Sequence, residues 1–159
     1  MSIKEKISSL GLSLPTAAAP VAAYVPAVKS GNLVFTAGQL PVVDGKLLKE
    51  GKVGRNVTVE EAKEFAQICA LNALAAISLV ADLDQIARVV RVGGFVNCAP
   101  GFTAIPGVIN GASEFLIKIF GDVNGKHART AVGVAELPLN APVEVEVIVQ
   151  LKTNFSNKG

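Results

Sequence analysis

The residues with the clearest chemical potential gather near the C-terminus, in the stretch HARTAVGVAELPLNAPVEVEVIVQ, residues 127–150. This stretch contains the single histidine, one of four arginines and three of the thirteen acidic residues. His127 titrates near neutrality and is a candidate base, although its place beside a Gly-Lys turn favours a solvated loop. Arg129 can belong to an ion pair or to a ligand site, and Glu144 and Glu146 are by default a solvated strand face. The residues alone leave these alternatives open.

The same stretch alternates apolar and other residues, which predicts a β-hairpin with its turn at LPLNAP. If the valines of both strands face the helices, Arg129 and Glu144 share the opposite face. The small Ala131, Gly133 and Ala135 lie on that face too, so we expect another copy of the chain to cover it, leaving clefts between. With Ala135 opposite Glu144, Arg129 lies about 20 Å further along its strand. A site that contains both is therefore predicted to form across a subunit boundary.

The rest of the chain supplies the elements that must position these residues. The segment YVPAVKSGNLVFTAGQLP predicts two short strands around a Gly31-Asn32 turn, and Asp44-Gly45 is a second turn. Thr58 and Glu61 form a capping box that begins a helix over residues 59–81. A strand containing Gly93-Gly94, which indicates a bulge or a close backbone approach, leads to a second helix in GVINGASEFLIKIFGD.

This order of elements, ββαβαββ with one optional extra strand, predicts an α+β fold. Its two helices should pack on one face of a mixed, mostly antiparallel sheet. We expect residues 1–20 to be an N-terminal lead-in without a core element, and residues 21–152 to form a single domain. Residues 153–159 should be a polar, frayed tail.

Composition limits the classes of function. Half of the 159 residues are hydrophobic and 18% are charged, which favours faces buried against another subunit or a large core. No apolar run is long enough to predict a membrane span, and the N-terminus does not resemble a signal peptide, so we expect a cytoplasmic protein. A net charge of +2 without a basic block argues against nucleic-acid binding. Two isolated cysteines and one histidine argue against a metal site.

Two motifs in the chain resemble signatures of the YjgF/RidA family. The C-terminal motif is an Ala-Arg-Thr strand start that leads through alternating valines to Leu-Pro and then to Val-Glu-Val-Glu. The N-terminal motif combines a tyrosine, a Gly-Asn turn and an Ala-Gly-Gln-Leu-Pro segment. The resemblance covers residues 20–151. It implies a chorismate-mutase-like fold, a homotrimer with ligand clefts between subunits, and hydrolysis of reactive enamines and imines without a cofactor.

The resemblance also implies roles for individual residues. Arg129 matches the arginine that grips the substrate carboxylate, and a guanidinium suits this because it offers two parallel donors. Glu144 matches the carboxylate that positions or activates the attacking water. Tyr24 matches a tyrosine of the pocket wall, Gly38 a loop glycine whose backbone approaches the ligand, and Asn110 an asparagine on the second helix.

The leading hypothesis is a hydrolase similar to 2-iminobutanoate/2-iminopropanoate deaminase. It would limit metabolite damage by converting small 2-imino acids, such as those derived from 2-aminoacrylate, to 2-keto acids and ammonia. The alternative is a non-catalytic trimer that binds a small carboxylate metabolite or a protein partner. An older family label, endoribonuclease L-PSP, ranks third because the chain offers no phosphate footprint. At residue 131 this chain has alanine where the family often has cysteine, and its loop 97–107 is long. These departures affect the prediction of the substrate more than the prediction of the chemistry.

Overall fold

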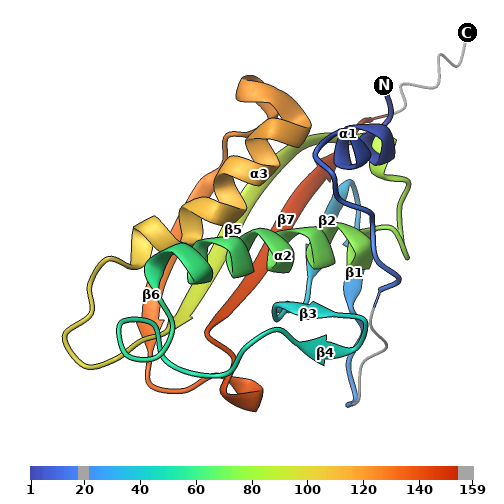
Figure 1. The fold of residues 1–159 in the computed structure, drawn as a ribbon. Coiled ribbons are helices and arrows are strands. Elements are labelled where there is room, and N and C mark those ends of the chain that lie inside the picture. Colours follow the sequence, from blue (N-terminus) through green and yellow to red (C-terminus); the bar gives the residue numbers. More distant parts are fainter. Residues whose placement is uncertain (18–21, 154–159) are drawn as a thin grey trace, which may run out of the picture.

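The computed structural model describes residues 1–17 and 22–153. In these residues a five-stranded sheet has the order β1-β2-β7-β5-β6 (Figure 1). The strands are β1 Ala27–Ser30, β2 Leu33–Thr36, β5 Ile86–Asn97, β6 Ala128–Val134 and β7 Val143–Leu151. Within the sheet β5 and β6 are parallel, and the other neighbouring strands are antiparallel. The prediction of an α+β fold with a mixed, mostly antiparallel sheet is confirmed.

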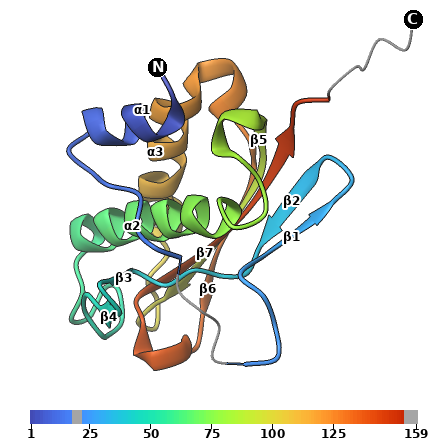
Figure 2. The same cartoon turned by 90° about the vertical axis from the view of Figure 1, so that its right-hand side faces the viewer.

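Two long helices, α2 Val59–Ile77 and α3 Ile105–Gly125, cover one face of this sheet (Figure 2). The predicted capping box begins α2, because the Thr58 hydroxyl accepts from the Glu61 amide and the Glu61 carboxylate accepts from the Thr58 amide. The helix ends at Ile77 rather than at the predicted residue 81. The Ser78 hydroxyl donates to the Ala75 carbonyl there, and such local bonds compete with the continuation of a helix.

Short elements complete the chain. Strands β3 Val42–Val43 and β4 Lys46–Leu47 form a separate hairpin around the predicted Asp44-Gly45 turn, where both residues have positive φ. The predicted Gly31-Asn32 turn joins β1 to β2. Two 3-10 turns are η1 Leu83–Gln85 and η2 Pro138–Asn140. No helix among the described residues is both long and apolar enough to cross a membrane.

The first residues of the chain form a helix, α1 Ile3–Ser9, where only a lead-in was predicted. A capping box between Ser2 and Glu5 begins it, and Ile3 and Ile7 are buried. The helix lies against α3 (Figure 2), and the Lys6 ammonium donates to the Ile119 carbonyl at 3.0 Å. The prediction of a lead-in is therefore wrong for residues 3–9, where the amphipathic spacing of Ile3 and Ile7 was overlooked, and residues 18–20 lie outside the described residues.

The two C-terminal strands do not form the predicted hairpin. β5 lies between β6 and β7 and pairs with both of them (Figure 1). Parallel strands cannot be joined by a tight turn, and α3 makes the crossover from β5 to β6. The prediction failed because the sequence pattern of two alternating strands with a proline- and asparagine-containing connection is the same whether or not the strands pair with each other.

The connection from β6 to β7 crosses the end of β5, where Asn97 is completely buried. The side-chain amide of Asn97 lies 3.1–3.3 Å from the carbonyls of Gly51 and Ala141 and from Asn140 Oδ1. Lys52 Nζ donates to Asn97 Oδ1 at 2.7 Å. This buried amide therefore holds the connection in place where a hairpin would have had a turn.

We expect Asn97→Leu to lower the free energy of unfolding by about 2–4 kcal/mol, because it removes the side-chain amide that the buried Gly51 and Ala141 carbonyls accept from. Chemical denaturation followed by circular dichroism measures this loss. The exposed Asn124 provides the matched control, and Asn124→Leu should change the free energy of unfolding little. A similar, small effect of both substitutions would contradict the role given to Asn97.

The strand faces agree with the prediction for β7 and reverse it for β6. The four valines of β7, at 143, 145, 147 and 149, are buried against the helices as expected. Arg129 of β6 is aligned with the buried Val92 of β5, so it faces α3. Val132 is aligned with Phe95, which pairs with Glu144 on the open face of the sheet. Arg129 and Glu144 therefore lie on opposite faces, not on the same one.

The glycine pair of β5 serves close packing, which was one of its two predicted roles. A Cβ on Gly94 would lie 2.5 Å from Ile109 of α3, and one on Gly93 would lie 2.7 Å from Glu146 Oε1. The irregularities in the pairing of β5 with β7 occur earlier in the strand, between residues 86 and 91. The glycines thus let α3 and β7 side chains approach the strand from its two faces.

Candidate active site

Arg129 lies in the edge strand β6 with its guanidinium against α3. Its NH1 nitrogen donates to Asn110 Oδ1 at 2.7 Å and to Ser113 Oγ at 3.2 Å. Both acceptors are neutral, and among the described residues no carboxylate lies within ion-pair distance of Arg129. The structure thus brings two predicted site residues, Arg129 and Asn110, into direct contact.

Helix α3 positions the two acceptors through its own burial. Its core face, which includes Ile109, Ala112 and Leu116, packs on the sheet. Asn110 and Ser113 are three residues apart, so they share the flank of the helix that lies beside β6. The apolar face therefore fixes the height and rotation at which the polar flank meets Arg129.

His127 is part of the same cluster, and the interpretation as a solvated loop histidine is wrong. It is half-buried, its Nε2 lies 2.9 Å from Ser113 Oγ, and its Nδ1 lies 2.6 Å from the Gly125 carbonyl. Burial lowers the pKa of His127 below its ordinary value, the Gly125 carbonyl opposes this, and the Arg129 charge lowers the pKa further. The sequence analysis weighed His127 as a base but favoured a solvated loop, and it missed Ser113; the i, i+2 spacing of His127 and Arg129 was a usable signal that the two share a strand face.

Glu144 and Gly38 meet on the other side of the sheet. Gly38 follows β2, and the next residue, Gln39, pairs with Val145 through backbone hydrogen bonds. A Cβ on Gly38 would lie 2.0 Å from Glu144 Oε1, so a larger residue would displace the carboxylate. Burial raises the pKa of Glu144, and the neighbouring Glu146 raises it further. Two predicted residues are thus in contact here as well.

A backbone hydrogen bond links the segment that contains Tyr24 to the segment that contains Gly38. Tyr24 lies in the segment before β1 and is 53% exposed. Two residues later the Pro26 carbonyl accepts from the Ala37 amide, which directly precedes Gly38. The role of Tyr24 as a pocket wall stays a prediction.

The predicted site residues therefore form two groups in one chain. The arginine half-site consists of Arg129 and Asn110, with Ser113 and His127 as additions, and faces α3. The glutamate half-site consists of Glu144 and Gly38, and the placement of Tyr24 beside them stays a prediction. Two strand spacings and three residues of offset separate Arg129 from Glu144, which is about 14 Å between Cα atoms. The predicted separation of about 20 Å assumed a hairpin; the two residues are apart because β5 lies between their strands.

Comparison with known proteins identifies the family. A family model described as YjgF/chorismate mutase-like matches residues 4–151. The chain belongs to this family. The match begins well before residue 20, where the sequence analysis placed the start of the resemblance, so it includes most of α1.

Several proteins are similar to this chain over most of its length. Protein TCP17 of Trypanosoma cruzi is 42% identical over 150 residues, which are 94% of each chain. A 2-iminobutanoate/2-iminopropanoate deaminase of Dermatophagoides farinae is 33% identical over 146 residues, 89% of this chain and 95% of the relative. The crystal structure of Atu1372 from Agrobacterium tumefaciens, a protein of unknown function, is 43% identical with a TM-score of 0.85. That match covers 94% of this chain and 92% of the other.

The small residues of β6 have a different role in this YjgF family member than predicted. We expected Ala131 and Gly133 to leave space for another copy of the chain or a ligand. A Cβ on Gly133 would instead lie 2.6 Å from Cys98 Sγ and 3.0 Å from Ile105 Cδ1. Ala131 packs against the core. The chain's own loop and helix α3 fill this space.

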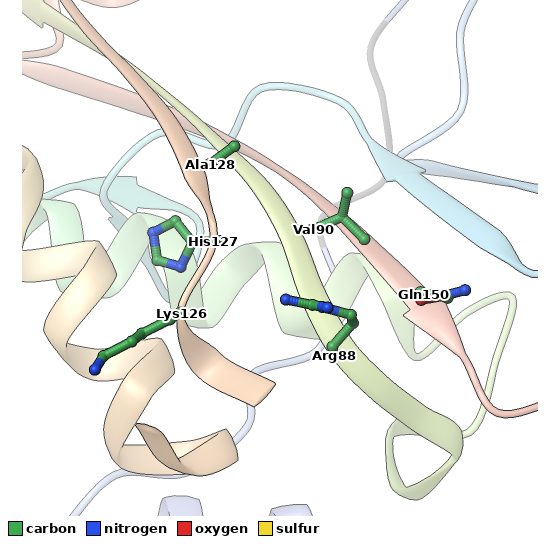
Figure 3. A pocket seen from close by; sticks show the side chains of 6 residues that line it. All are labelled: Arg88, Val90, Lys126, His127, Ala128 and Gln150. Carbon is green, nitrogen blue, oxygen red and sulfur yellow. The ribbon is translucent and has the colours of Figure 1, made fainter. Parts of the chain in front are cut away.

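A surface groove lies near the start of β6 (Figure 3), lined by Arg88, Val90, Lys126, His127, Ala128 and Gln150. None of the family-matched site residues lines it. In Figure 3 the His127 ring lies on one side of the β6 ribbon and Arg88 on the other. The groove therefore adjoins the arginine half-site only at His127.

Proposed function

We propose that this chain hydrolyses small 2-imino acids and their enamine tautomers to 2-keto acids and ammonia, in clefts between the subunits of a homotrimer. The observation that carries the proposal is that the Arg129 charge has no carboxylate partner among the described residues. The guanidinium is held by two neutral oxygens at one nitrogen. Such a cation suits the carboxylate of a substrate, which guanidinium binds through parallel hydrogen bonds.

The separation of the two half-sites supports clefts between subunits. One chain places Arg129 and Glu144 on opposite sheet faces, so a substrate that contacts both needs a second copy. The open face also carries exposed apolar side chains, with Val28 51%, Phe35 40% and Val132 40% exposed. Exposed apolar patches of this kind are typical of subunit interfaces. This agrees with the homotrimer that the family resemblance implied.

The proposed reaction needs a carboxylate anchor and an activated water. Arg129 binds the substrate carboxylate and thereby fixes the C=N carbon. Glu144 of a neighbouring subunit, as a carboxylate, accepts a proton from water while the oxygen bonds to that carbon. The raised pKa of Glu144 makes it a stronger base than an exposed glutamate. Glu144 then passes this proton to the nitrogen as the C=N double bond opens, which gives a carbinolamine. The hydroxyl proton moves through Glu144 to the amino group, the C–N bond breaks as the C=O bond forms, and ammonia leaves the 2-keto acid behind.

The relative from Dermatophagoides farinae, which is named a 2-iminobutanoate/2-iminopropanoate deaminase, supports this choice of substrate class. The test generates 2-iminobutanoate in place with an amino acid oxidase and measures whether the chain accelerates its hydrolysis. Saturable binding of 2-oxobutanoate without any acceleration would instead favour a binding protein.

Mixed subunits test whether the cleft is shared. We expect Arg129→Ala and Glu144→Gln to be nearly inactive alone, whereas isolated mixed trimers should regain about one third of the wild-type sites, because one of their three interfaces pairs an intact Arg129 with an intact Glu144. Co-expression with two affinity tags isolates the mixed species, and analytical ultracentrifugation gives its mass as a multiple of 16.4 kDa. Mixed oligomers as inactive as the separate variants would show that each site lies within one chain.

A further inference from the structure

We propose that Ser113 and His127 are positioning residues for Arg129. A hydrogen-bond chain runs from the Gly125 carbonyl through the imidazole and the Ser113 hydroxyl to the guanidinium, and it fixes the plane in which Arg129 meets a carboxylate. The inference rests on the proposed role of Arg129 in substrate binding. It assigns a role to Ser113 and His127, which are not among the residues that the family resemblance matched.

The direction of each hydrogen bond follows from the chemistry of the partners. The Gly125 carbonyl can only accept, so His127 Nδ1 carries a proton and donates to it. In the neutral imidazole Nε2 is then the acceptor, and the Ser113 hydroxyl donates to it at 2.9 Å. The lone pairs of Ser113 Oγ are left for Arg129 NH1 at 3.2 Å.

This arrangement occupies one end of the guanidinium completely. NH1 has two hydrogens, and one is directed to Asn110 Oδ1 while the other is directed to Ser113 Oγ. Because the guanidinium is planar, holding both hydrogens of NH1 prevents rotation of the group. The N–H groups of NH2 and Nε have no acceptor among the described residues and remain for a ligand.

The surroundings of His127 favour its neutral form. Arg129 is close on β6, and Arg88 of β5 and Lys126 line the adjoining groove, so the neighbouring charges are positive. Glu114, next to Ser113 on α3, is already paired with a lysine of α2. A protonated imidazole would donate to Ser113 and compete with Arg129 for its lone pairs. Burial and Arg129 both lower the pKa of His127, in agreement with this geometry.

Nitrogen-15 NMR tests the hydrogen-bond chain directly, because the imidazole signals of this chain come from one histidine. We expect His127 to be the Nδ1–H tautomer at neutral pH, with a titration midpoint below the ordinary 6.5. We also expect slow rotation of the Arg129 Nη groups in wild type and faster rotation in Ser113→Ala. An Nε2–H tautomer, or unchanged Arg129 rotation in Ser113→Ala, would overturn the inference.

Kinetics with matched variants test the consequence for binding. We expect Ser113→Ala and His127→Leu to raise KM for the imino acid about three- to tenfold with little change in kcat, since a positioned anchor acts on ground and transition states alike. Ser113→Thr keeps the hydroxyl and should restore KM. Ser8→Ala, an exposed serine on α1, is the control and should leave KM unchanged.

An unchanged KM in Ser113→Ala, or a loss confined to kcat and thermal stability, would contradict a positioning role. The NMR measurements need no activity. A chain that hydrolyses no imine but shows the expected tautomer and restricted arginine would refute the proposed function and leave the hydrogen-bond chain standing. The reverse pair of results would refute the inference alone.

Discussion

Arg129→Ala should lower kcat/KM for 2-iminobutanoate by about 10²- to 10³-fold, because it removes a charge-assisted and geometrically specific pair with the substrate carboxylate. The loss should be large since Arg129 has no described carboxylate partner whose release would offset it. Steady-state kinetics with enzymatically generated imine measures the effect. The same variant should lose its affinity for 2-oxobutanoate in calorimetry.

Two further variants separate charge from geometry at this position. Arg129→Lys keeps the charge but cannot form two parallel hydrogen bonds, so it should recover only part of the activity. Arg55→Ala removes an exposed arginine that has no hydrogen bond or ion pair with a described residue of either half-site, and it should match wild type. If Arg129→Ala hydrolyses imine as fast as wild type, the proposed function is wrong.

Glu144→Gln should lower kcat by about 10²- to 10⁴-fold while changing KM little, because the amide cannot accept the proton of the attacking water. Loss of folding would not explain this result. The Glu144 carboxylate is half-buried without an ion-pair partner among the described residues, and burial disfavours its charge. The neutral glutamine should therefore leave Tm at neutral pH unchanged or raise it. A low Tm together with low activity would contradict this explanation.

The pH dependence of the wild type provides a second measurement on the same group. The active form of Glu144 is the carboxylate, and burial, followed by Glu146, raises its pKa above the ordinary 4.5. Activity should therefore be full well above that raised pKa and should be lost as the pH falls through it. Glu146→Gln removes the neighbouring charge, so it should move this acid limb to lower pH and preserve activity. An acid limb that stays in place in Glu146→Gln would contradict the assignment of the limb to Glu144.

Local signals predicted local structure in this chain. The Thr58–Glu61 capping box begins α2, and the Gly31-Asn32 and Asp44-Gly45 turns lie where glycine and asparagine suggested. These features depend on neighbours within a few residues, which a sequence displays directly. The family signatures also pointed to Arg129 with Asn110 and to Glu144 with Gly38, pairs that the structure brings into contact.

Local sequence signals could not predict the order of the strands in the sheet or which face of β6 is buried. Alternation along β6 divides its residues into two sets but does not say which set faces the helix. Val132 looked like the buried set, yet Cys98 and Ile105 leave room only for Gly133 on the helix side. His127 was interpreted as a solvated loop residue because its contact with Ser113, fourteen residues earlier, forms only in the folded chain.

The order of strands has a consequence for synthesis of the chain on the ribosome. β7, the last of the described strands in chain order, occupies the middle of the sheet between β2 and β5. Until Val143–Leu151 has emerged, the five-stranded sheet is represented only by the β1-β2 hairpin and the β5-β6 pair, with no strand to bridge them. Folding of the sheet is thus a late, concerted event that depends on contacts distant in sequence. A ribosome that stalls before Val143 leaves two separate fragments of sheet with open edges, which are substrates for chaperones or for aggregation.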